Sequence, residues 1–142
     1  MKLVQHLLDT KGNDVISITG DASVFDAIRV MAERSVGSLL VIEDEKIVGI
    51  VTERDYARKV ILLGRSSETT TVAAIMTTEV ITATAEQTVS ECMTLMSEKR
   101  IRHLPVVADD KVIGLISIGD LVQAIISDQQ QEIEQLESYI SG

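Results

Sequence analysis

The chain has 142 residues, and aromatic side chains, cysteine and histidine are all scarce in it. Only Phe25, Tyr56 and Tyr139 could stack on bases, and the net charge of −9, from 13 basic and 22 acidic residues, repels a phosphate backbone. We therefore expect no nucleic-acid binding. Charged residues interrupt every apolar run before it reaches the length of a membrane span, so we also expect no membrane insertion.

The nucleophiles and metal ligands are equally few. Cys92, the single cysteine, falls on the apolar stripe of a predicted helix, where a free cysteine is usually a small core residue. His6 and His103 have no metal-binding or catalytic spacing, so an enzyme is disfavoured and no metal is expected. Because the first residues lack the long apolar stretch of a signal peptide, we expect a reduced, cytoplasmic protein.

The chain contains an internal repeat. Residues 15–60 align without a gap to residues 80–125, and 12 of the 46 aligned positions are identical. Each unit is too small to form a strong core alone, so we expect the two units to pack sheet to sheet as one body, with pseudo-two-fold symmetry and paired clefts. The expected segments are a helix and lead-in over 1–14, a first unit over 15–63, a polar, flexible connector over 64–76, a second unit over 77–126 and an amphipathic helix over 127–142.

The periodicity of each unit predicts the order β-α-β-β-α, an α/β fold of the α+β type. In the first copy a strand over 15–18 precedes apolar positions 24, 27, 28 and 31, which mark one face of a helix. A hairpin over 39–51 and a second helix after Thr52 follow. The second copy repeats this order, from a strand over 80–82 to a helix after Ser117. Ser23 with Asp26, and Thr88 with Glu91, have the spacing of helix-starting capping boxes.

One motif occurs in both copies: a glycine, two apolar residues, a hydroxyl and, three residues later, an aspartate. Thr52 and Asp55 carry it in the first copy, and Ser117 and Asp120 in the second. A helix start offers free N–H groups to a phosphate, and a carboxylate one turn later can accept both hydroxyls of a ribose. The same spacing is also that of a capping box, which implies no ligand.

Three details favour the ligand interpretation of this motif. The glycine is kept in both copies, the pair follows a strand, and seven of the 13 basic residues cluster nearby in sequence, although exposed basic helix faces would explain them equally. Arg102 or His103 could bind a phosphate, and Arg102 suits it better because a guanidinium is a bidentate donor. The aligned residues of the first copy are Gly37 and Ser38, so the two clefts cannot be chemically equal.

These motifs, together with Arg-His-Leu-Pro-Val-Val at 102–107 and Ala-Ile-Met-Thr at 74–77, resemble a tandem pair of cystathionine-beta-synthase (CBS) domains, a Bateman module, over residues 15–126. The resemblance implies a regulatory sensor, not an enzyme, that has no obligatory cofactor. It would bind AMP, ADP, ATP, NAD or S-adenosylmethionine in clefts between the two units. Because the chain has no room for an appended enzyme or channel, we expect it to act on a target in trans.

The resemblance also implies roles for individual residues. Asp55 and Asp120 would hold ribose hydroxyls, Thr52 and Ser117 would contact ribose or phosphate, and Arg102 and His103 would face the phosphates. Arg54 would be the first copy's substitute for the missing basic motif, where Gly37 and Ser38 stand. The remaining positions would surround the adenine or line the cleft: Ile16, Ser17, Ile18, Met76, Ile81, Thr82, Ala83 and Pro105.

The C-terminal segment carries a heptad-like apolar stripe. Ile126, Ile133, Leu136 and Ile140 follow one another at steps of 7, 3 and 4. The stripe could pack on its own module, pair in a homodimer or recruit an unidentified target protein. An alternative function is therefore a structural or interaction module with vestigial clefts that recruits a partner through this helix.

Overall fold

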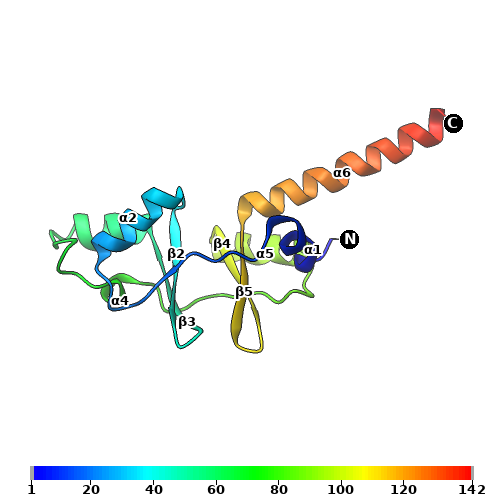
Figure 1. Ribbon diagram of the computed structural model, residues 1–142. Coiled ribbons are helices and arrows are strands. Elements are labelled where there is room, and N and C mark those ends of the chain that lie inside the picture. Colours follow the sequence, from blue (N-terminus) through cyan, green and yellow to red (C-terminus); the bar gives the residue numbers. More distant parts are fainter. Residues whose placement is uncertain (1, 142) are drawn as a thin grey trace. The chain divides into compact units, whose positions relative to one another are not determined.

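The computed structural model describes residues 2–141, which divide into two compact units (Figure 1). Unit 1 comprises Met1–Asn13, Thr82–Ala108 and Ile113–Gly142, and unit 2 comprises Asp14–Ile81 and Asp109–Val112. Unit 2 therefore contains the first sequence copy, and unit 1 contains most of the second.

Unit 2 is a three-stranded sheet covered by helix α2. The strands β1 (Ser17–Ile18), β2 (Ser38–Glu43) and β3 (Lys46–Thr52) lie in the order β1-β2-β3, with β1 parallel to β2 and β2 antiparallel to β3. The helical segments are α2 (Val24–Arg34), α3 (Glu53–Tyr56), the π-helical η1 (Ala57–Ile61) and α4 (Val72–Ile75). The predicted apolar stripe is confirmed, because Val24, Ala27 and Met31 are buried in the core formed with β2 and β3.

Unit 1 repeats the design with a smaller sheet. Its elements are α1 (Val4–Lys11), α5 (Val89–Lys99), β4 (His103–Ala108), β5 (Lys111–Ser117) and α6 (Ile118–Ser141), and β4 and β5 form a two-stranded sheet. The helix predicted for the second copy is confirmed, since Val89, Cys92 and Met96 of α5 are buried. Cys92 is a free, fully buried thiol, as expected of a core residue, and burial, followed by the charge of Glu91, raises its pKa.

The strand predicted over 80–82 is wrong. Only Ala83 pairs with β4, through a single parallel bridge to Val106. In unit 2 the equivalent segment gains a further bond, because the Leu40 N–H donates to the Ile16 carbonyl. The residue aligned with Leu40 is Pro105, which has no N–H to donate. The second copy therefore keeps the same pairing register, but it lacks the successive backbone hydrogen bonds that would define a strand.

The predicted helix starts are confirmed. Ser23 accepts a hydrogen bond from the Asp26 N–H, and Thr88 and Glu91 form a complete capping box. The two copies then differ after the repeated motif. In unit 2 the second helix is short and passes into η1, whereas in unit 1 the second helix and the predicted C-terminal helix are one continuous α6 of 24 residues.

The connector between the copies is hydrogen-bonded to unit 2. Its Thr70 and Ser67 carbonyls accept from the N–H groups of Val24 and Phe25, at the start of α2, and the Tyr56 hydroxyl lies 3.1 Å from that of Ser67. These bonds lead the chain into α4, where Val72 and Ile75 are buried.

The two lead-in helices pack in corresponding ways, α1 on unit 1 and α4 on unit 2. The Val4 N–H donates to Gln87, as the Val72 N–H does to Ala22. Each helix then crosses the glycine of the repeated motif closely. A Cβ on Gly114 would lie 2.5 Å from Leu8 Cδ2, and one on Gly49 would lie 2.6 Å from Met76 Sδ. The glycine that both copies of the motif share therefore allows close packing of the lead-in segment.

Candidate ligand site

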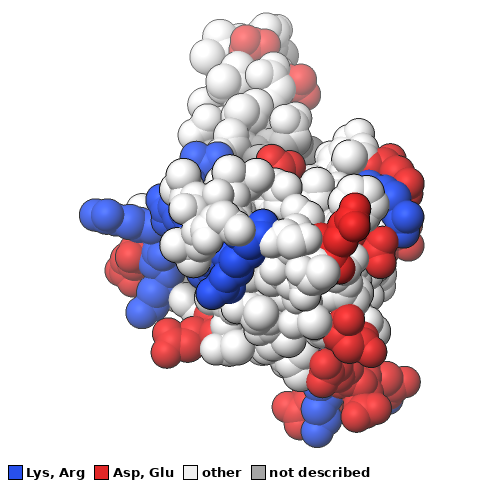
Figure 2. Space-filling view, turned by 90° about the vertical axis from the view of Figure 1, so that its left-hand side faces the viewer, with Lys and Arg blue, Asp and Glu red and all other residues white. Residues whose placement is uncertain are grey.

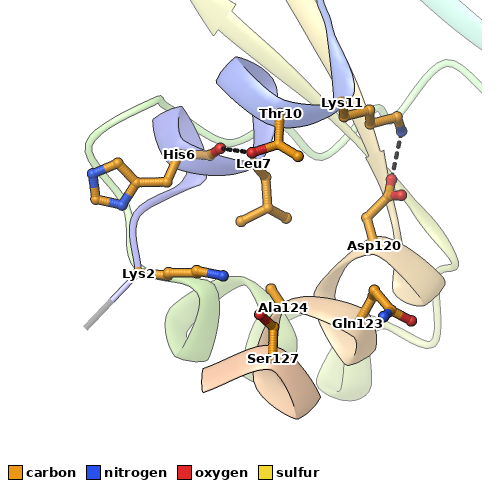
Figure 3. A pocket seen from close by; sticks show the side chains of 9 residues that line it. All are labelled: Lys2, His6, Leu7, Thr10, Lys11, Asp120, Gln123, Ala124 and Ser127. Carbon is orange, nitrogen blue, oxygen red and sulfur yellow. Dashed lines mark hydrogen bonds and ion pairs between the residues drawn. The ribbon is translucent and has the colours of Figure 1, made fainter. Parts of the chain in front are cut away.

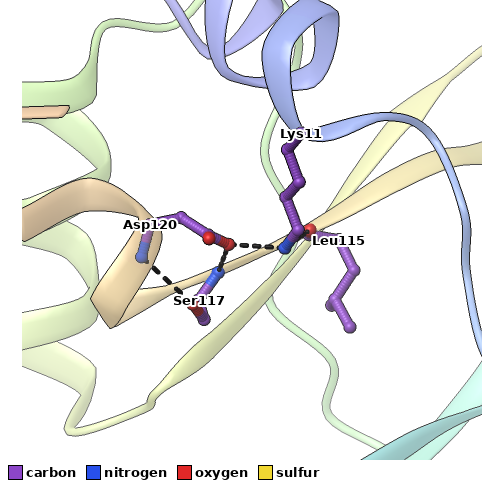
Figure 4. A network of polar contacts seen from close by, with 4 residues as sticks. All are labelled: Lys11, Leu115, Ser117 and Asp120. Atoms are coloured by element: carbon purple, nitrogen blue, oxygen red, sulfur yellow. Dashed lines mark hydrogen bonds and ion pairs between the residues drawn. The ribbon is translucent and has the colours of Figure 1, made fainter. Parts of the chain in front are cut away.

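The site in unit 1 lies where β5 passes into α6. Asp120 Oδ2 accepts a hydrogen bond from the Ser117 N–H (2.8 Å), and Ser117 Oγ accepts one from the Asp120 N–H (3.1 Å). The Lys11 ammonium of α1 donates to Asp120 Oδ2 and to the Leu115 carbonyl (Figure 4). The capping interpretation of the motif is thus confirmed in this unit, and Lys11 adds a charge that comes from the other end of the sequence.

This site shifts the pKa of two groups. Burial alone raises the pKa of Asp120, but the hydrogen bond and charge of Lys11, with the bonds from Ser117, lower it below the ordinary value. Burial lowers the pKa of His103, the nearby charges of Lys11 and Arg102 lower it further, and Asp120 opposes them. His103 therefore lies close enough to Lys11 and Asp120 for their charges to act on its pKa.

The corresponding site in unit 2 lies where β3 passes into α3. Asp55 Oδ2 accepts from the Thr52 N–H (3.0 Å) and hydroxyl (3.1 Å), and Thr52 Oγ1 accepts from the Asp55 N–H. Lys59 lies 3.2 Å from Asp55 Oδ1 and donates to the Ile75 carbonyl at the end of α4. In both units, a lysine thus joins the motif carboxylate to the lead-in helix.

The segments that precede β2 and β4 lie beside these motifs. The Glu53 N–H donates to the Gly37 carbonyl, and the Ile118 N–H donates to the Arg102 carbonyl. Ser38 is the cross-strand partner of Thr52. Each unit therefore places its version of the predicted phosphate-facing segment next to its hydroxyl and carboxylate, with Arg102 and His103 in unit 1 and Gly37 and Ser38 in unit 2.

The residues expected around the adenine are divided between the units. Ser17 and Ile18 pair with β2, and Met76 packs over Gly49, all in unit 2. Ala83 and Pro105 are buried neighbours in unit 1, joined by the Ala83 N–H and the Pro105 carbonyl. The other expected residues vary in exposure: Ile16 and Ile81 are half-buried, and Thr82 and Arg54 are exposed.

The basic residues of unit 2 do not form a single anion site. Lys59 is turned onto Asp55, while Arg54 and Arg58 are exposed. Figure 2 shows Lys and Arg mainly toward the left, and Asp and Glu mainly along the right and at the bottom. Lys59 belongs to the basic cluster expected near the motif, but its pairing with Asp55 was not predicted, and Lys11 was not singled out. The spacing of Lys59 from Asp55 (i, i+4) could have revealed that pairing, whereas Lys11 lies 109 residues from Asp120 and leaves no local signal.

A pocket of about 240 Å³ lies between α1 and α6 in unit 1 (Figure 3). Lys11 and Asp120 stand together at one side of it, and Lys2, paired with Asp128 at 3.4 Å, stands at another. Thr10 and Ser127 also line this space, and the Thr10 hydroxyl donates to the His6 carbonyl. Beside the Lys11–Asp120 contact, α1 and α6 therefore border a space that both polar and apolar side chains line.

The model of the CBS domain family matches the chain twice, over residues 8–61 and 72–127. The chain belongs to the CBS-domain family. A curated relative, the CBS domain-containing protein CBSX3, mitochondrial, of Arabidopsis thaliana, is 46% identical over 129 residues, which make up 87% of this chain and 63% of the relative. The chain thus spans less than two thirds of that relative's length.

Solved CBS structures have the same fold. The CBS domain of NE2398 is 51% identical, with a TM-score of 0.84 over 88% of this chain and 98% of that one. The CBS domain pair of MJ0100, in complex with 5′-methylthioadenosine and S-adenosyl-L-methionine, is 26% identical, with a TM-score of 0.79 over 90% and 98%. The predicted tandem CBS pair is confirmed. Within residues 2–141 of the CBS chain, no helix is long and apolar enough to cross a membrane.

Proposed function

We propose that the chain is a non-catalytic regulatory module that binds an adenosine-containing ligand and acts on a target protein in the cytoplasm. The ligand class is AMP, ADP, ATP, NAD or S-adenosylmethionine. Asp120 and Asp55 hold the ribose hydroxyls, with Ser117 and Thr52 beside the ribose or phosphate. The observation that carries the proposal is the repeated placement of a half-buried carboxylate and a hydroxyl at a strand–helix junction in a CBS pair.

The hydrogen bonding of the Asp120 carboxylate supports its ribose-binding role. Oδ2 carries two hydrogen bonds, whereas Oδ1 has no partner among the described residues. A carboxylate has lone pairs on both oxygens, so one hydroxyl of a vicinal diol could bind Oδ1 directly, and the second could bind Oδ2 in place of a present donor. The MJ0100 complex with two adenosine compounds supports the ligand class, since this chain shares its fold and 26% of its residues.

The two sites are unequal in their phosphate-facing segments. Unit 1 offers the guanidinium of Arg102 and the imidazole of His103, while unit 2 offers Gly37 and Ser38 at the aligned positions, with exposed Arg54 nearby in sequence. A ligand with a phosphate therefore favours the unit 1 residues, because a guanidinium binds phosphate oxygens in a bidentate manner. The remaining candidates supply the surroundings of a base within each unit: Ile16, Ile18, Met76 and Ile81 in unit 2, and Thr82, Ala83 and Pro105 in unit 1.

Calorimetric titration of the dialysed chain tests this function. AMP, ADP, ATP, NAD, S-adenosylmethionine and GTP are titrated into the wild type, Asp120→Ala and Asp55→Ala. We expect binding of at least one adenine ligand, no binding of GTP, and a loss of about 1–3 kcal/mol, roughly 5- to 150-fold in affinity, in Asp120→Ala. Failure of every adenine ligand to bind protein shown to be free of co-purified nucleotide would reject the proposal.

The exposed face of α6 favours a second role, association through this helix. Ile126, Ile133, Leu136, Tyr139 and Ile140 are between 49% and 87% exposed. We propose that a second copy of the chain covers this stripe, which gives a homodimer. Residues 128–141 carry four acidic and no basic side chains, so paired helices repel each other, and the dimer should strengthen with salt.

Sedimentation equilibrium of the wild type and of Leu136→Glu tests the dimer. The variant should be monomeric with adenine-ligand binding unchanged, and 0.5 M NaCl should tighten the wild-type dimer. A wild type that is monomeric at all concentrations would reject the homodimer and favour a separate target protein on the stripe. A dimer that survives Leu136→Glu would place the interface elsewhere.

A further inference from the structure

The Lys11 ammonium occupies the carboxylate oxygen that a ribose would need. Asp120 Oδ2 already accepts two donors, the Ser117 N–H and the Lys11 ammonium, which use both of its lone pairs. The Ser117 N–H belongs to the backbone at the helix start and is fixed there. A diol that engages both carboxylate oxygens must therefore displace Lys11.

Lys11 is also the polar anchor at the end of α1. The first five residues of this helix are held by backbone bonds to Gln87 and Ala85 and by the buried side chains of Val4, Leu7 and Leu8. At its C-terminal end, Lys11 donates to Asp120 and to the Leu115 carbonyl. Gly12 follows, with a φ of 97°, and unit 1 ends at Asn13. The ammonium thus secures the last turn before the chain passes into unit 2.

We propose that Lys11 is a displaceable component of the unit 1 site: the ribose hydroxyls exchange with its ammonium on Asp120, which releases the last turn of α1 and the junction to unit 2. This inference rests on the proposed function, because it takes Asp120 as the ribose-binding group. It assigns to α1 the task of reporting ligand occupancy.

Two further observations support the exchange. The pocket between α1 and α6, which Thr10, Gln123 and Ser127 help to line, gives the displaced ammonium a partly polar space (Figure 3). Unit 2 couples its carboxylate to its lead-in helix in the same way, since Lys59 joins Asp55 to the Ile75 carbonyl of α4. In each unit a lysine connects the motif carboxylate to the lead-in helix, although the two lysines come from different elements.

The first test measures binding of adenosine, a neutral ligand whose affinity is not complicated by phosphate charge. Lys11→Met should bind adenosine about two- to fivefold more tightly than the wild type, the range expected when a partly exposed ion pair no longer competes. Lys2→Met is the matched control: it removes a lysine of the same pocket that pairs with Asp128 instead, and should leave the affinity unchanged. Weaker binding by Lys11→Met would overturn the proposal and make Lys11 a ligand contact.

The second test measures hydrogen exchange of the amides in the last turn of α1, including the Gly12 N–H that donates to Leu8. Asp120→Asn should speed this exchange without any ligand, and saturating adenosine should speed it in the wild type. If adenosine binds but exchange stays the same or slows, the displacement is wrong while the proposed function stands. If adenosine and the nucleotides all fail to bind, both the proposed function and the ligand exchange are rejected, even where Asp120→Asn loosens α1.

Discussion

A methyl group added at Gly114 tests how α1 packs on unit 1. The ideal Cβ would lie 2.5 Å from Leu8 Cδ2, 3.3 Å from Cδ1 and 3.5 Å from Cγ. Leu8 is 1% exposed and cannot turn away into solvent. Overpacking of this kind costs about 1–3 kcal/mol, so we expect Gly114→Ala to lower the free energy of unfolding by that amount.

Truncating the Leu8 side chain should remove the destabilisation caused by Gly114→Ala. Leu8→Ala alone should destabilise by about 2–5 kcal/mol, because it deletes a fully buried side chain. In that background Gly114→Ala should be close to neutral, so the two changes should be non-additive by about 1–3 kcal/mol. Gly119→Ala is the control, since its Cβ would meet only Ser117 Oγ, at 3.6 Å, and alanine favours the helix.

Urea unfolding at pH 7 measures these differences as shifts of the midpoint at constant slope. The reasoning is refuted if Gly114→Ala costs the same with and without the Leu8 side chain. That result would mean that the repeated glycine is required for another reason, such as backbone approach to a ligand.

Three further predictions concern the charges of unit 1 and the packing of unit 2. Because its pKa is lowered in the fold, ionised Asp120 stabilises the chain above pH 3.8, its ordinary pKa, and this contribution is lost as the pH falls through the lowered pKa. The difference in free energy of unfolding between wild type and Asp120→Asn, measured with urea, should therefore shrink toward zero in acid. A difference that stays constant with pH would contradict the assignment. The pKa of His103, followed by NMR, should rise in Lys11→Met and fall in Asp120→Asn; no movement in either would place both charges too far away. Gly49→Ala should destabilise unit 2 by about 1–3 kcal/mol, and shortening Met76 to Ala should relieve this clash, as measured by the same unfolding assay; a cost unchanged by Met76→Ala would assign the clash to the Thr77 carbonyl, 3.0 Å from the added Cβ.

Most of the fold could be predicted from the sequence because the signals are local. The stripes of α2 and α5, the two hairpins and the capping residues Ser23 and Thr88 follow from periodicity and spacing within each copy. The wrong strand over 80–82 depends on Pro105, whose missing N–H matters only once β4 is known to be its partner. The continuity of α6 was missed because Ser127 and Asp128 suggest a boundary where helical hydrogen bonding continues.

The candidate site could be predicted only in part. The hydroxyl–carboxylate pairs are visible as a repeated motif, and the structure places Gly37 and Arg102 beside them. The charges that act on the carboxylates are not visible, because Lys11 reaches Asp120 only through the packing of α1 on unit 1. The glycine that favoured a ligand in the sequence is explained by the approach of Leu8 and Met76. Contacts that depend on tertiary packing have no characteristic spacing in the sequence, so they could not be predicted from it.

The measurement that tests the central claim most directly compares adenosine with 2′,3′-dideoxyadenosine by calorimetry, in the wild type and in Asp120→Asn. If Asp120 binds the ribose hydroxyls, removing those hydroxyls should weaken binding to the wild type by about tenfold or more, the value of a hydrogen bond to a charged group. The same comparison should give a much smaller difference in Asp120→Asn. Equal affinities of the two nucleosides for the wild type would contradict the account.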